Sequence, residues 1–386
     1  NYAWVYKERG ETGVANADLI SAAPEVWTSD HKLVDIANLY VRLLYNSDVY
    51  SSGASFNMST MVKGHAVFDS RISDTLWSEN PALIARDYLV NEMGVSTSEV
   101  DDDGCEAAAN ICDETVLDAD GNSRKRYTCN IVLSTSDSPR DNLNKIARCM
   151  AGWVKKIGGK WRFNAGAHKS SSLSLTLADL RGPIQFQTND EPSQSCNGVR
   201  ATFLSPENNW QGASAPAVIK IVTAPNITAG AQCTILSVGT TNFTAIGAAS
   251  NTVGVTFVAT GAGTGTGTVD PYLGADNGVR RWRDLDLHGC TNQPEAIRRE
   301  WIELQKARHE LTIVAPLMFQ GFKVQPGDYV DWTVSEFGWS GKLAEVTRQK
   351  HIYQQQENGL AIGFDIVTRE VSSSIYSRTA ADETTE

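Results

Sequence analysis

Three oxygen-bearing side chains at the start of DADGNSRKR, residues 118–126, have the spacing of the first ligands in a calcium loop. Asp118, Asp120 and Asn122 would supply the first, third and fifth positions of such a loop. A calcium loop also requires glycine at its sixth position and glutamate at its twelfth, but Ser123 and Cys129 stand there. The sequence therefore favours a solvated hairpin turn over a calcium site.

Other patterns of catalysis do not occur in this sequence. The six histidines are scattered, and there is no H-E-x-x-H, G-x-S-x-G or P-loop pattern. The run GAGTGTGT lacks the strand, turn and helix that surround a dinucleotide-binding fingerprint. The acids at 101–103 stand where a helix begins, and they offset the positive end of its dipole. We therefore predict no catalytic, cofactor-binding or metal-binding residues and no enzymatic activity.

The cysteines indicate buried thiols and not a disulfide framework. There are seven of them, an odd number, and no C-x-x-C pair occurs. Cys105 and Cys112 fall on one face of a predicted helix, about 10 Å apart at about 1.5 Å per residue, which is too far for a disulfide. We expect reduced, mostly buried cysteines.

Tryptophan is the other residue type that could form a binding site. Aromatic rings can stack on sugars, so a carbohydrate-binding platform is one interpretation of the tryptophans. The alternative is that they anchor cores and interfaces, as large aromatic side chains usually do. The residues concerned are Trp77, Trp153, Trp161, Trp210, Trp282, Trp301, Trp332 and Trp339.

Composition excludes several classes of protein. The chain has 386 residues and a formal net charge of −11, which argues against a nucleic-acid-binding protein. Its apolar runs are too short for a transmembrane helix. The N-terminal sequence NYAWVYKERG has neither an initiator methionine nor the features of a signal peptide. We expect a piece of a longer chain.

Two helices are predicted between residues 78 and 114. In WSENPALIARDYLVNEMG, Asn80 fits the N-cap, Pro81 the first helical position and Gly94 the C-terminal end. In DDDGCEAAANICDE, two cysteines and two alanines recur at the spacing of a single helix face. The length suggests two or three domains, and these helices would belong to one of them.

The strongest helix signal lies in SPRDNLNKIARCMAGWVKKIGG. Ser138 and Asp141 form a capping box, and the apolar stripe runs from Leu143 to Ile157, so that Gly158 and Gly159 would end the helix. A weaker helical period appears in DHKLVDIANLYVRLLYN, residues 30–46. Strands are expected at 62–71, in KWRFNAG, and through much of 173–204.

Residues 217–269 differ from their flanks in composition. They are rich in threonine, glycine, alanine and valine and almost free of charge, with alternating apolar positions and glycine breaks. The flanking sequences SPENNWQ and DPYLGAD read as two ends of one loop. We therefore predict a small β insertion in a host domain.

A helix and a tight turn dominate the region after residue 290. Pro294 begins a helix with an apolar stripe of Ile297, Trp301, Leu304 and Leu311, and with arginine and glutamate on its other side. The Pro-Gly-Asp sequence at 326–328 has the chemistry of a turn that leads into the strand YVDWTV. An antiparallel pair of strands with QQENG between them follows.

Several of these segments, taken in order, resemble the tail tip proteins of lambda-type bacteriophages. They are AVFDSR…WSENPALIARDYL, GCEAAANICDE, RYTCNIVL, the capped helix ending GGKWRF, QPEAIRREWIELQKAR and PGDYVDW…GWSGKLAEV. The family is that of protein J, the host specificity or tip attachment protein of siphovirus tails. The resemblance covers about residues 60–375 apart from 217–269, and it corresponds to the central hub region of that family.

The resemblance implies an α+β, β-rich fold of phage tail hub domains, β-barrel-like with packed helices. Helix 294–310 would pack on the barrel that receives the strand after the 326–328 turn. The expected division has five parts: an N-terminal hub segment, 1–66; a mixed helix and strand domain, 67–172; a β-rich domain, 173–216 with 270–372; the Thr/Gly-rich insertion, 217–269; and a polar C-terminal exit, 373–386.

The resemblance also implies partners and a location. The protein would form a homotrimer that closes the tail tube at its tip, in contact with other tail tip and tail tube proteins, and would take part in host attachment and DNA ejection. DNA would pass without specific binding, and a host-surface receptor would be contacted through regions outside this chain. The expected location is the virion, after assembly in the host cytoplasm. The alternative function is a carbohydrate-binding adhesin module of a virion.

Overall fold

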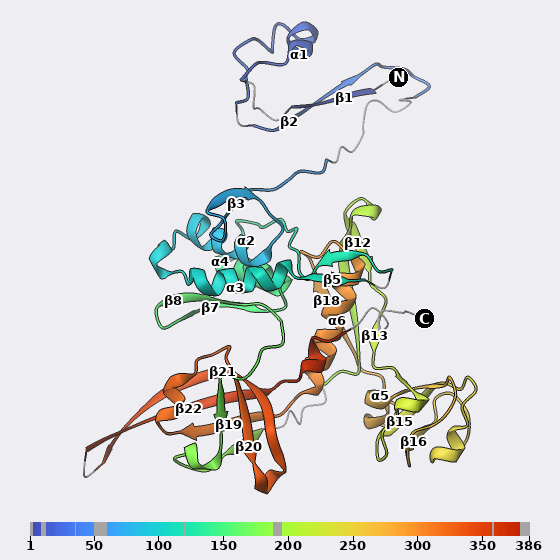
Figure 1. The fold of residues 1–386 in the computed structure, drawn as a ribbon. Coiled ribbons are helices and arrows are strands. Elements are labelled where there is room, and N and C mark those ends of the chain that lie inside the picture. The colour runs from blue at the N-terminus through green and yellow to red at the C-terminus, as the bar shows by residue number, and fades with distance from the viewer. Residues whose placement is uncertain are drawn as a thin grey trace. The chain divides into compact units, whose positions relative to one another are not determined.

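The computed structural model describes residues 3–8, 13–34, 36–49, 60–118, 120–187, 195–356 and 359–378. The chain divides into two compact units, Asn1–Lys63 and Gly64–Glu386, and each is described by itself. Figure 1 names their helices and strands. Both helices and sheets are abundant, which confirms the α+β, β-rich class.

The first unit is a strand pair with a short helix. Strand β1 (Ala3–Glu8) pairs antiparallel with β2 (Asn38–Leu43), and α1 (Ala17–Ala22) lies between them in the sequence. The helix predicted at 30–46 is therefore wrong. Tyrosine and valine favour a strand here, and the pairing of Tyr6 with Tyr40 and Val5 with Val41 gives them cross-strand partners.

This first unit buries very little of its apolar surface. Among its described residues, Ala15 is the one buried hydrophobic side chain. Val14, Val26 and Tyr45 are each more than two-thirds exposed. A two-stranded hairpin is marginally stable in water without a further packing surface. The described residues of this unit therefore form little hydrophobic core of their own.

The second unit begins with a helical layer around one core. It contains the hairpin β3 (Ala66–Asp69) and β4 (Asp74–Trp77), and the helices α2 (Pro81–Asp87), α3 (Asp102–Asp113) and α4 (Pro139–Cys149). It also contains the hairpins β5 (Thr115–Leu117) with β6 (Ser123–Lys125) and β7 (Trp153–Ile157) with β8 (Lys160–Asn164).

The predicted starts of these helices are confirmed. The Asn80 side chain accepts a hydrogen bond from the Ala82 N–H and caps α2. After α2 the chain continues as a short π-helix, Tyr88–Glu92. Gly94 then takes a positive φ of 66°, as expected for a glycine that ends a helix. All four residues of the predicted α3 stripe are buried: Cys105, Ala108, Ala109 and Cys112.

The predicted end of α4 is wrong. The Ser138 cap is confirmed, but the helix ends at Cys149, and residues 153–157 form β7. Ala151 takes a positive φ of 49°, which breaks the helix. Gly158 and Gly159 turn the β7–β8 hairpin instead of ending a helix. The segment WVKKI fits both a helical and a strand pattern, and its pairing with β8 decides between them.

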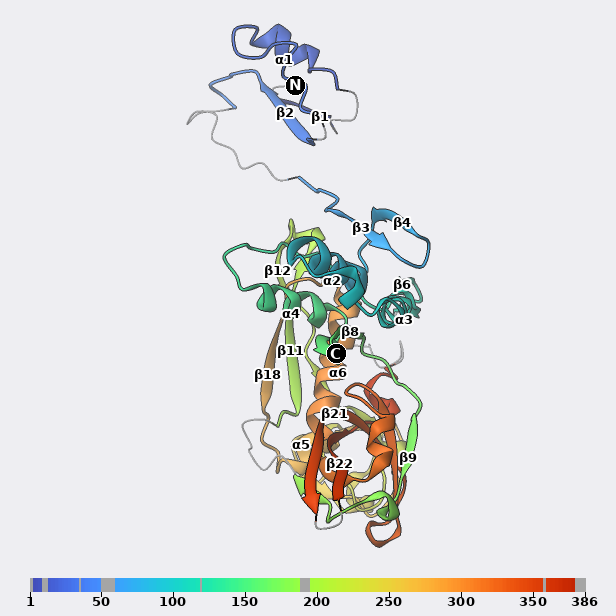
Figure 2. The ribbon, with the colours of Figure 1, turned by 90° about the vertical axis from the view of Figure 1, so that its left-hand side faces the viewer.

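The second core lies between α6 (Gln293–Arg308) and a four-stranded sheet. Strand β11 (Gly198–Ser205) pairs with β12 (Gln211–Ser214) and β13 (Val218–Ile219) antiparallel and with β18 (Trp282–Leu287) parallel. Figure 2 shows β11 and β18 side by side next to α6. The stripe residues Ile297, Trp301 and Leu304 lie in this core. The prediction that α6 packs on the sheet of the 326–328 turn is therefore wrong.

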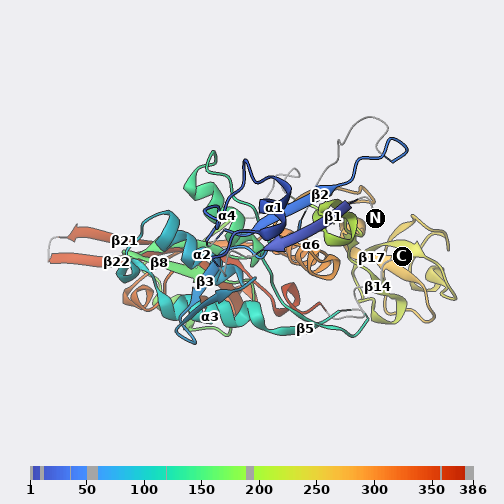
Figure 3. The same ribbon diagram turned by 90° about the horizontal axis from the view of Figure 1, so that it is seen from above.

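The third core belongs to a six-stranded sheet. Its order is β10 (Gln185–Gln187), β19 (Thr312–Leu317), β22 (Gly359–Glu370), β21 (Trp339–Gln356), β20 (Tyr329–Val334) and β9 (Leu173–Leu175). The pairing among described residues is an open path and not a closed barrel. Strand β21 has 18 residues against 6 in β20, and its hairpin with β22 extends past the neighbouring strands (Figure 3).

The turn at 326–328 has the predicted geometry. The Asp328 N–H donates to the Gln325 carbonyl at 3.0 Å, and Gly327 has a φ of 97°. The Gln325 N–H donates back to the Asp328 carboxylate at 2.9 Å. The turn leads directly into β20, whose Val330, Trp332 and Val334 are buried in the core of the sheet.

Most of residues 217–269 form a fourth sheet with its own core. Its order is β14 (Val222–Thr223), β17 (Thr268–Asp270), β15 (Gln232–Ser237) and β16 (Thr256–Val258). Phe243, Ile235 and Val269 are buried in it. The short helix α5 (Pro271–Ala275) then leads to β18. Val218, however, is buried in the core of the β11 sheet, so that sheet includes the first residues of the range.

We predict that residues 222–269 can be removed without unfolding the rest of the second unit. Val222 and Val269 are paired across β14 and β17, so a bridge of three glycine and serine residues spans the gap. Thermal unfolding of this variant should retain the main cooperative transition. As a control, deletion of 217–269 also removes β13 and the buried Val218 and should lower the midpoint. Insoluble expression of the 222–269 deletion would contradict the prediction.

Candidate functional site: a buried charge network on α6

The acidic loop at 118–122 is a hairpin turn between β5 and β6. The Asp118 carboxylate accepts hydrogen bonds from the Asp120 and Asn122 N–H groups at 3.1 and 2.8 Å and from Arg124 Nε at 2.7 Å. These bonds, the one from Arg124 first, lower the pKa of Asp118 to about 2. The carboxylate oxygens of Asp118 therefore accept hydrogen bonds from within the turn, as expected if this loop has a structural role.

The remaining sequence candidates for chemistry are dispersed. Within the described ranges, no three side chains of histidine, cysteine, aspartate or glutamate meet as a metal site would require. All seven cysteines are buried and unpaired. Trp332 lies in the six-stranded sheet, Trp301 in the α6 core and Trp161 against the helical layer. No helix in the described part of the chain is long and apolar enough to span a membrane.

Several charged residues are instead buried on α6, for which the sequence predicted an apolar stripe that faces one sheet. Glu295 and Glu300 are fully buried, and Arg298 and Arg299 are over nine-tenths buried. Charged residues are almost never fully buried unless they are paired. The hydrogen bonds described below account for the burial of Glu295 and Arg299, which lie where α6 meets the helical layer.

Glu295 joins α6 to the helical layer. Its carboxylate accepts hydrogen bonds from the Thr128 hydroxyl at 2.7 Å and from the Thr128 N–H at 3.2 Å. Arg299, one turn further along the helix, has its Nη1 3.9 Å from Glu295 Oε1 and donates from Nη2 to the Arg148 carbonyl at 2.6 Å. Burial raises the pKa of Glu295, against the opposing effects of Arg299 and Thr128.

Two cysteines complete the surroundings of Arg299. The Cys149 thiol donates to the Lys145 carbonyl at 3.4 Å, and Cys129 immediately follows Thr128. A Cβ at Gly289 would lie 2.4 Å from Cys149 Sγ, so only glycine fits at that position. The network is therefore closely packed as well as charged.

Other α6 side chains reach the remaining parts of the second unit. Trp301 Nε1 donates to the Ser374 carbonyl at 3.1 Å, beyond the end of β22. Arg308 pairs with Asp276, just after α5, and Gln305 accepts from the Tyr272 hydroxyl at 2.9 Å. From β22, Arg369 donates to the Lys306 carbonyl at 2.7 Å. A single helix therefore contacts the helical layer, both larger sheets and the α5 segment.

The sequence does contain one local signal for the position of Glu295, which is the Asn-x-x-Glu spacing at the start of α6. Asn292 is the N-cap of α6 and accepts from the Glu295 N–H at 2.8 Å, and its own side-chain amide donates back to Glu295 at 3.3 Å. The spacing Asn-x-x-Glu is a form of capping box. It predicts a carboxylate that turns toward the helix start, but nothing in the sequence predicts that Thr128 lies there.

Comparisons with known proteins found matches at low sequence identity. No protein-family model matches the chain. The chain is 19% identical over 343 residues to the baseplate hub protein pb3 of Escherichia phage T5; the match covers 83% of this chain and 30% of that protein. The chain therefore spans less than a third of the length of this relative.

Two solved structures also resemble the chain at low identity. A component of the native gene transfer agent virion is 11% identical with a TM-score of 0.49, and the match covers 100% of this chain and 77% of that one. The 43 kDa tail protein of prophage MuSo2 from Shewanella oneidensis is 10% identical with a TM-score of 0.36, and the match covers 89% and 74% of the two chains. The first of these three proteins is a baseplate hub protein, the second belongs to a virion and the third is a tail protein.

We predict that Glu295→Ala lowers the free energy of unfolding by about 3–5 kcal/mol, because it leaves Arg299 and Thr128 buried without their partner. Urea denaturation followed by tryptophan fluorescence measures the change. The matched control is Glu303→Ala on the same helix, which breaks the partly exposed pair with Arg283 and should cost about 1 kcal/mol or less. Equal losses in the two variants would contradict the role assigned to Glu295.

Glu300 gives the second unit a predictable dependence on pH. Burial raises its pKa to about 8, against smaller opposing effects of the Ala201 backbone and Arg378. An unfolded glutamate titrates near 4.3, so the folded state binds more protons between these two values, and stability should fall as the pH rises from about 5 to 8. At about 1.4 kcal/mol per pKa unit, this is a loss of a few kcal/mol.

We therefore expect Glu300→Gln to flatten the fall in stability between pH 5 and 8 and to be more stable than the natural chain at pH 8. Unfolding midpoints measured across this range test the expectation. Glu303→Gln, which changes a partly exposed glutamate on the same helix, should retain the natural slope. A slope unaltered by Glu300→Gln would show that another group causes the pH dependence.

Proposed function

We propose that the chain is a structural subunit of a bacteriophage tail tip, and that three copies form the central hub that closes the tail tube. The similarity to the T5 baseplate hub protein over 83% of the chain carries this proposal. The sequence resemblance to lambda-type tail tip proteins of the J family supports the same place in the virion. Host attachment and DNA ejection are the processes in which such a hub takes part.

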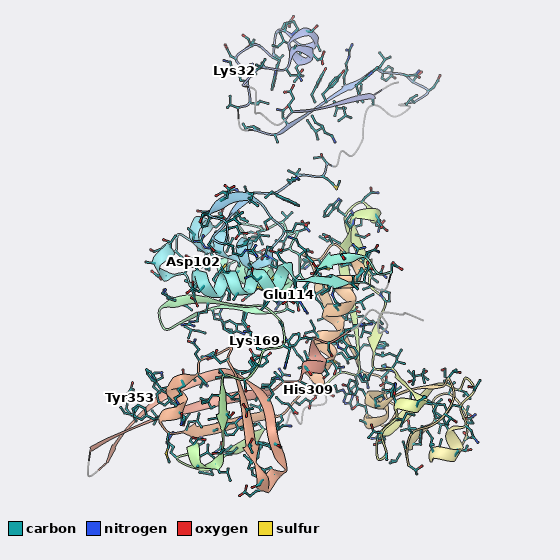
Figure 4. The ribbon with its side chains drawn as sticks, viewed as in Figure 1. Lys32, Asp102, Glu114, Lys169, His309 and Tyr353 are labelled. Carbon is teal, nitrogen blue, oxygen red and sulfur yellow. The ribbon has the colours of Figure 1, made fainter. Side chains whose placement is uncertain are left out.

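The architecture supports a scaffold. The cores of the second unit are joined through buried hydrogen bonds and ion pairs of α6. Such an arrangement stabilises the fold and does not supply a reactive group. The unpartnered apolar surface of the first unit fits a subunit that is completed by its neighbours. Phe319, Phe322 and Tyr353 of the second unit are also more than three-fifths exposed, and Figure 4 labels Tyr353 on the projecting hairpin.

The charge of the chain suits a channel for DNA. The sequence has 45 acidic residues against 34 lysines and arginines. Basic surfaces bind phosphates by releasing counterions, so a neutral or acidic lumen would let DNA pass without holding it. Of the tryptophans considered for carbohydrate binding, Trp301 and Trp332 are buried in separate cores and are not accessible to a sugar.

Mass photometry tests the proposed trimer. We expect a species of three times the 42.0 kDa chain mass that persists on dilution and in high salt, because an interface built on apolar surface is weakly screened. Averaged electron micrographs of that species should show three-fold symmetry. A chain that stays monomeric at high concentration, or particles of another symmetry, would contradict the proposal.

A further inference from the structure

Two of the buried cysteines lie next to each other in the core of the helical layer. Cys129 follows strand β6, and Cys149 is the last residue of α4. A Cβ atom placed on Gly289 would lie 2.4 Å from the Cys149 sulfur and 3.6 Å from the Cys129 sulfur, so the separation of the two sulfurs cannot exceed the sum of these distances. A change of rotamer at either cysteine moves its sulfur by a comparable length. Bonding distance is therefore within reach of the pair.

The charge network of α6 holds the residue that precedes each of the two cysteines. The Glu295 carboxylate accepts hydrogen bonds from Thr128, directly before the first cysteine. Arg299 donates to the carbonyl of Arg148, directly before the second. Glu295 and Arg299 are one helical turn apart, with 3.9 Å between their charged groups. One turn of one helix therefore positions both cysteines and keeps them together.

A third cysteine, Cys290, is the competing partner for Cys149. It follows Gly289 directly and is buried in the α6 core. Its thiol donates to the Asn292 carbonyl at 3.2 Å, at the start of α6. Because the Cys290 thiol already has this bond, we expect Cys129 to be the partner of Cys149.

Burial determines which oxidant can reach this pair. Cys129 is 3% exposed and Cys149 is 2% exposed. A bulky disulfide such as oxidised glutathione must contact the attacking sulfur directly, and the surrounding core blocks that contact. A hydrogen peroxide molecule is close to water in size and enters during local opening of the structure. Oxidation of the pair should therefore be slow and should require a small oxidant.

We propose that Cys129 and Cys149 form an oxidative modification site, at which hydrogen peroxide converts the two thiols to a disulfide after the protein leaves the reducing cytoplasm. One sulfur, as its thiolate, attacks a peroxide oxygen and breaks the O–O bond, which gives a sulfenic acid and, after protonation, water. The second sulfur attacks the sulfenic sulfur and releases another water. The two thiols thus lose two electrons and two protons, and the peroxide is reduced to two waters. A use outside the cell rests on the proposed virion location, whereas the chemistry does not.

Peptide mapping of the full chain after overnight exposure to excess hydrogen peroxide tests the proposal. Free thiols are alkylated, and trypsin then releases peptides 127–140 and 149–155, each with a single cysteine. We expect these two peptides to be linked and the other cysteines to be alkylated. Alkylation of all seven cysteines would overturn the proposal, provided that the same exposure in urea oxidises the chain. A link from 149–155 to 284–298, the peptide of Cys290, would overturn it as well.

Thermal unfolding measures what the link does to the structure. The disulfide would close a loop of about 20 residues, and such loops stabilise a fold mainly by restricting the unfolded chain. We expect the midpoint of the oxidised chain to lie about 5 °C above that of the reduced chain, and dithiothreitol to restore the original value. An unchanged or lower midpoint in a chain that carries the link would show that the disulfide strains the fold and would overturn a stabilising role.

Substitutions assign the effect to this pair. Cys129→Ala and Cys149→Ala should each abolish both the link and the rise in midpoint. Cys112→Ala is the matched control, because Cys112 is a buried cysteine of the same core and should leave both intact. A peroxide-dependent rise that persists in a folded Cys129→Ala or Cys149→Ala chain would refute the assignment. If either variant fails to fold, the peptide map of the natural chain still decides.

Discussion

The burial of Glu295 and Arg299 on α6 is the constraint on which the second unit depends. A buried carboxylate is costly unless hydrogen bonds satisfy it, and those bonds come from Thr128, which lies 167 residues earlier in the chain. Once Thr128 is in place, the Arg148 carbonyl can receive Arg299. The helical layer therefore has a fixed position on α6, because any other arrangement would leave charge buried without a partner.

The same helix explains how several small cores behave as one structure. Each core is limited in size, and each contributes limited burial by itself. Trp301 donates to the Ser374 carbonyl in the segment after β22, and the Lys306 carbonyl accepts a hydrogen bond from the Arg369 side chain of β22. Arg308 pairs with Asp276 in the segment after α5. These contacts join the cores of the second unit through one helix.

Local sequence signals determined the helix starts, the turn at 326–328 and the α3 stripe, because caps, prolines and glycines act through neighbouring residues. They failed at 30–46 and at 153–157, where one pattern fits both a helix and a strand, and pairing with β1 and β8 decided. The partner sheet of α6 and the burial of Glu295 were set only by the tertiary structure. Both depend on contacts between residues far apart in the sequence, and no local periodicity encodes which distant hydroxyl will satisfy a carboxylate.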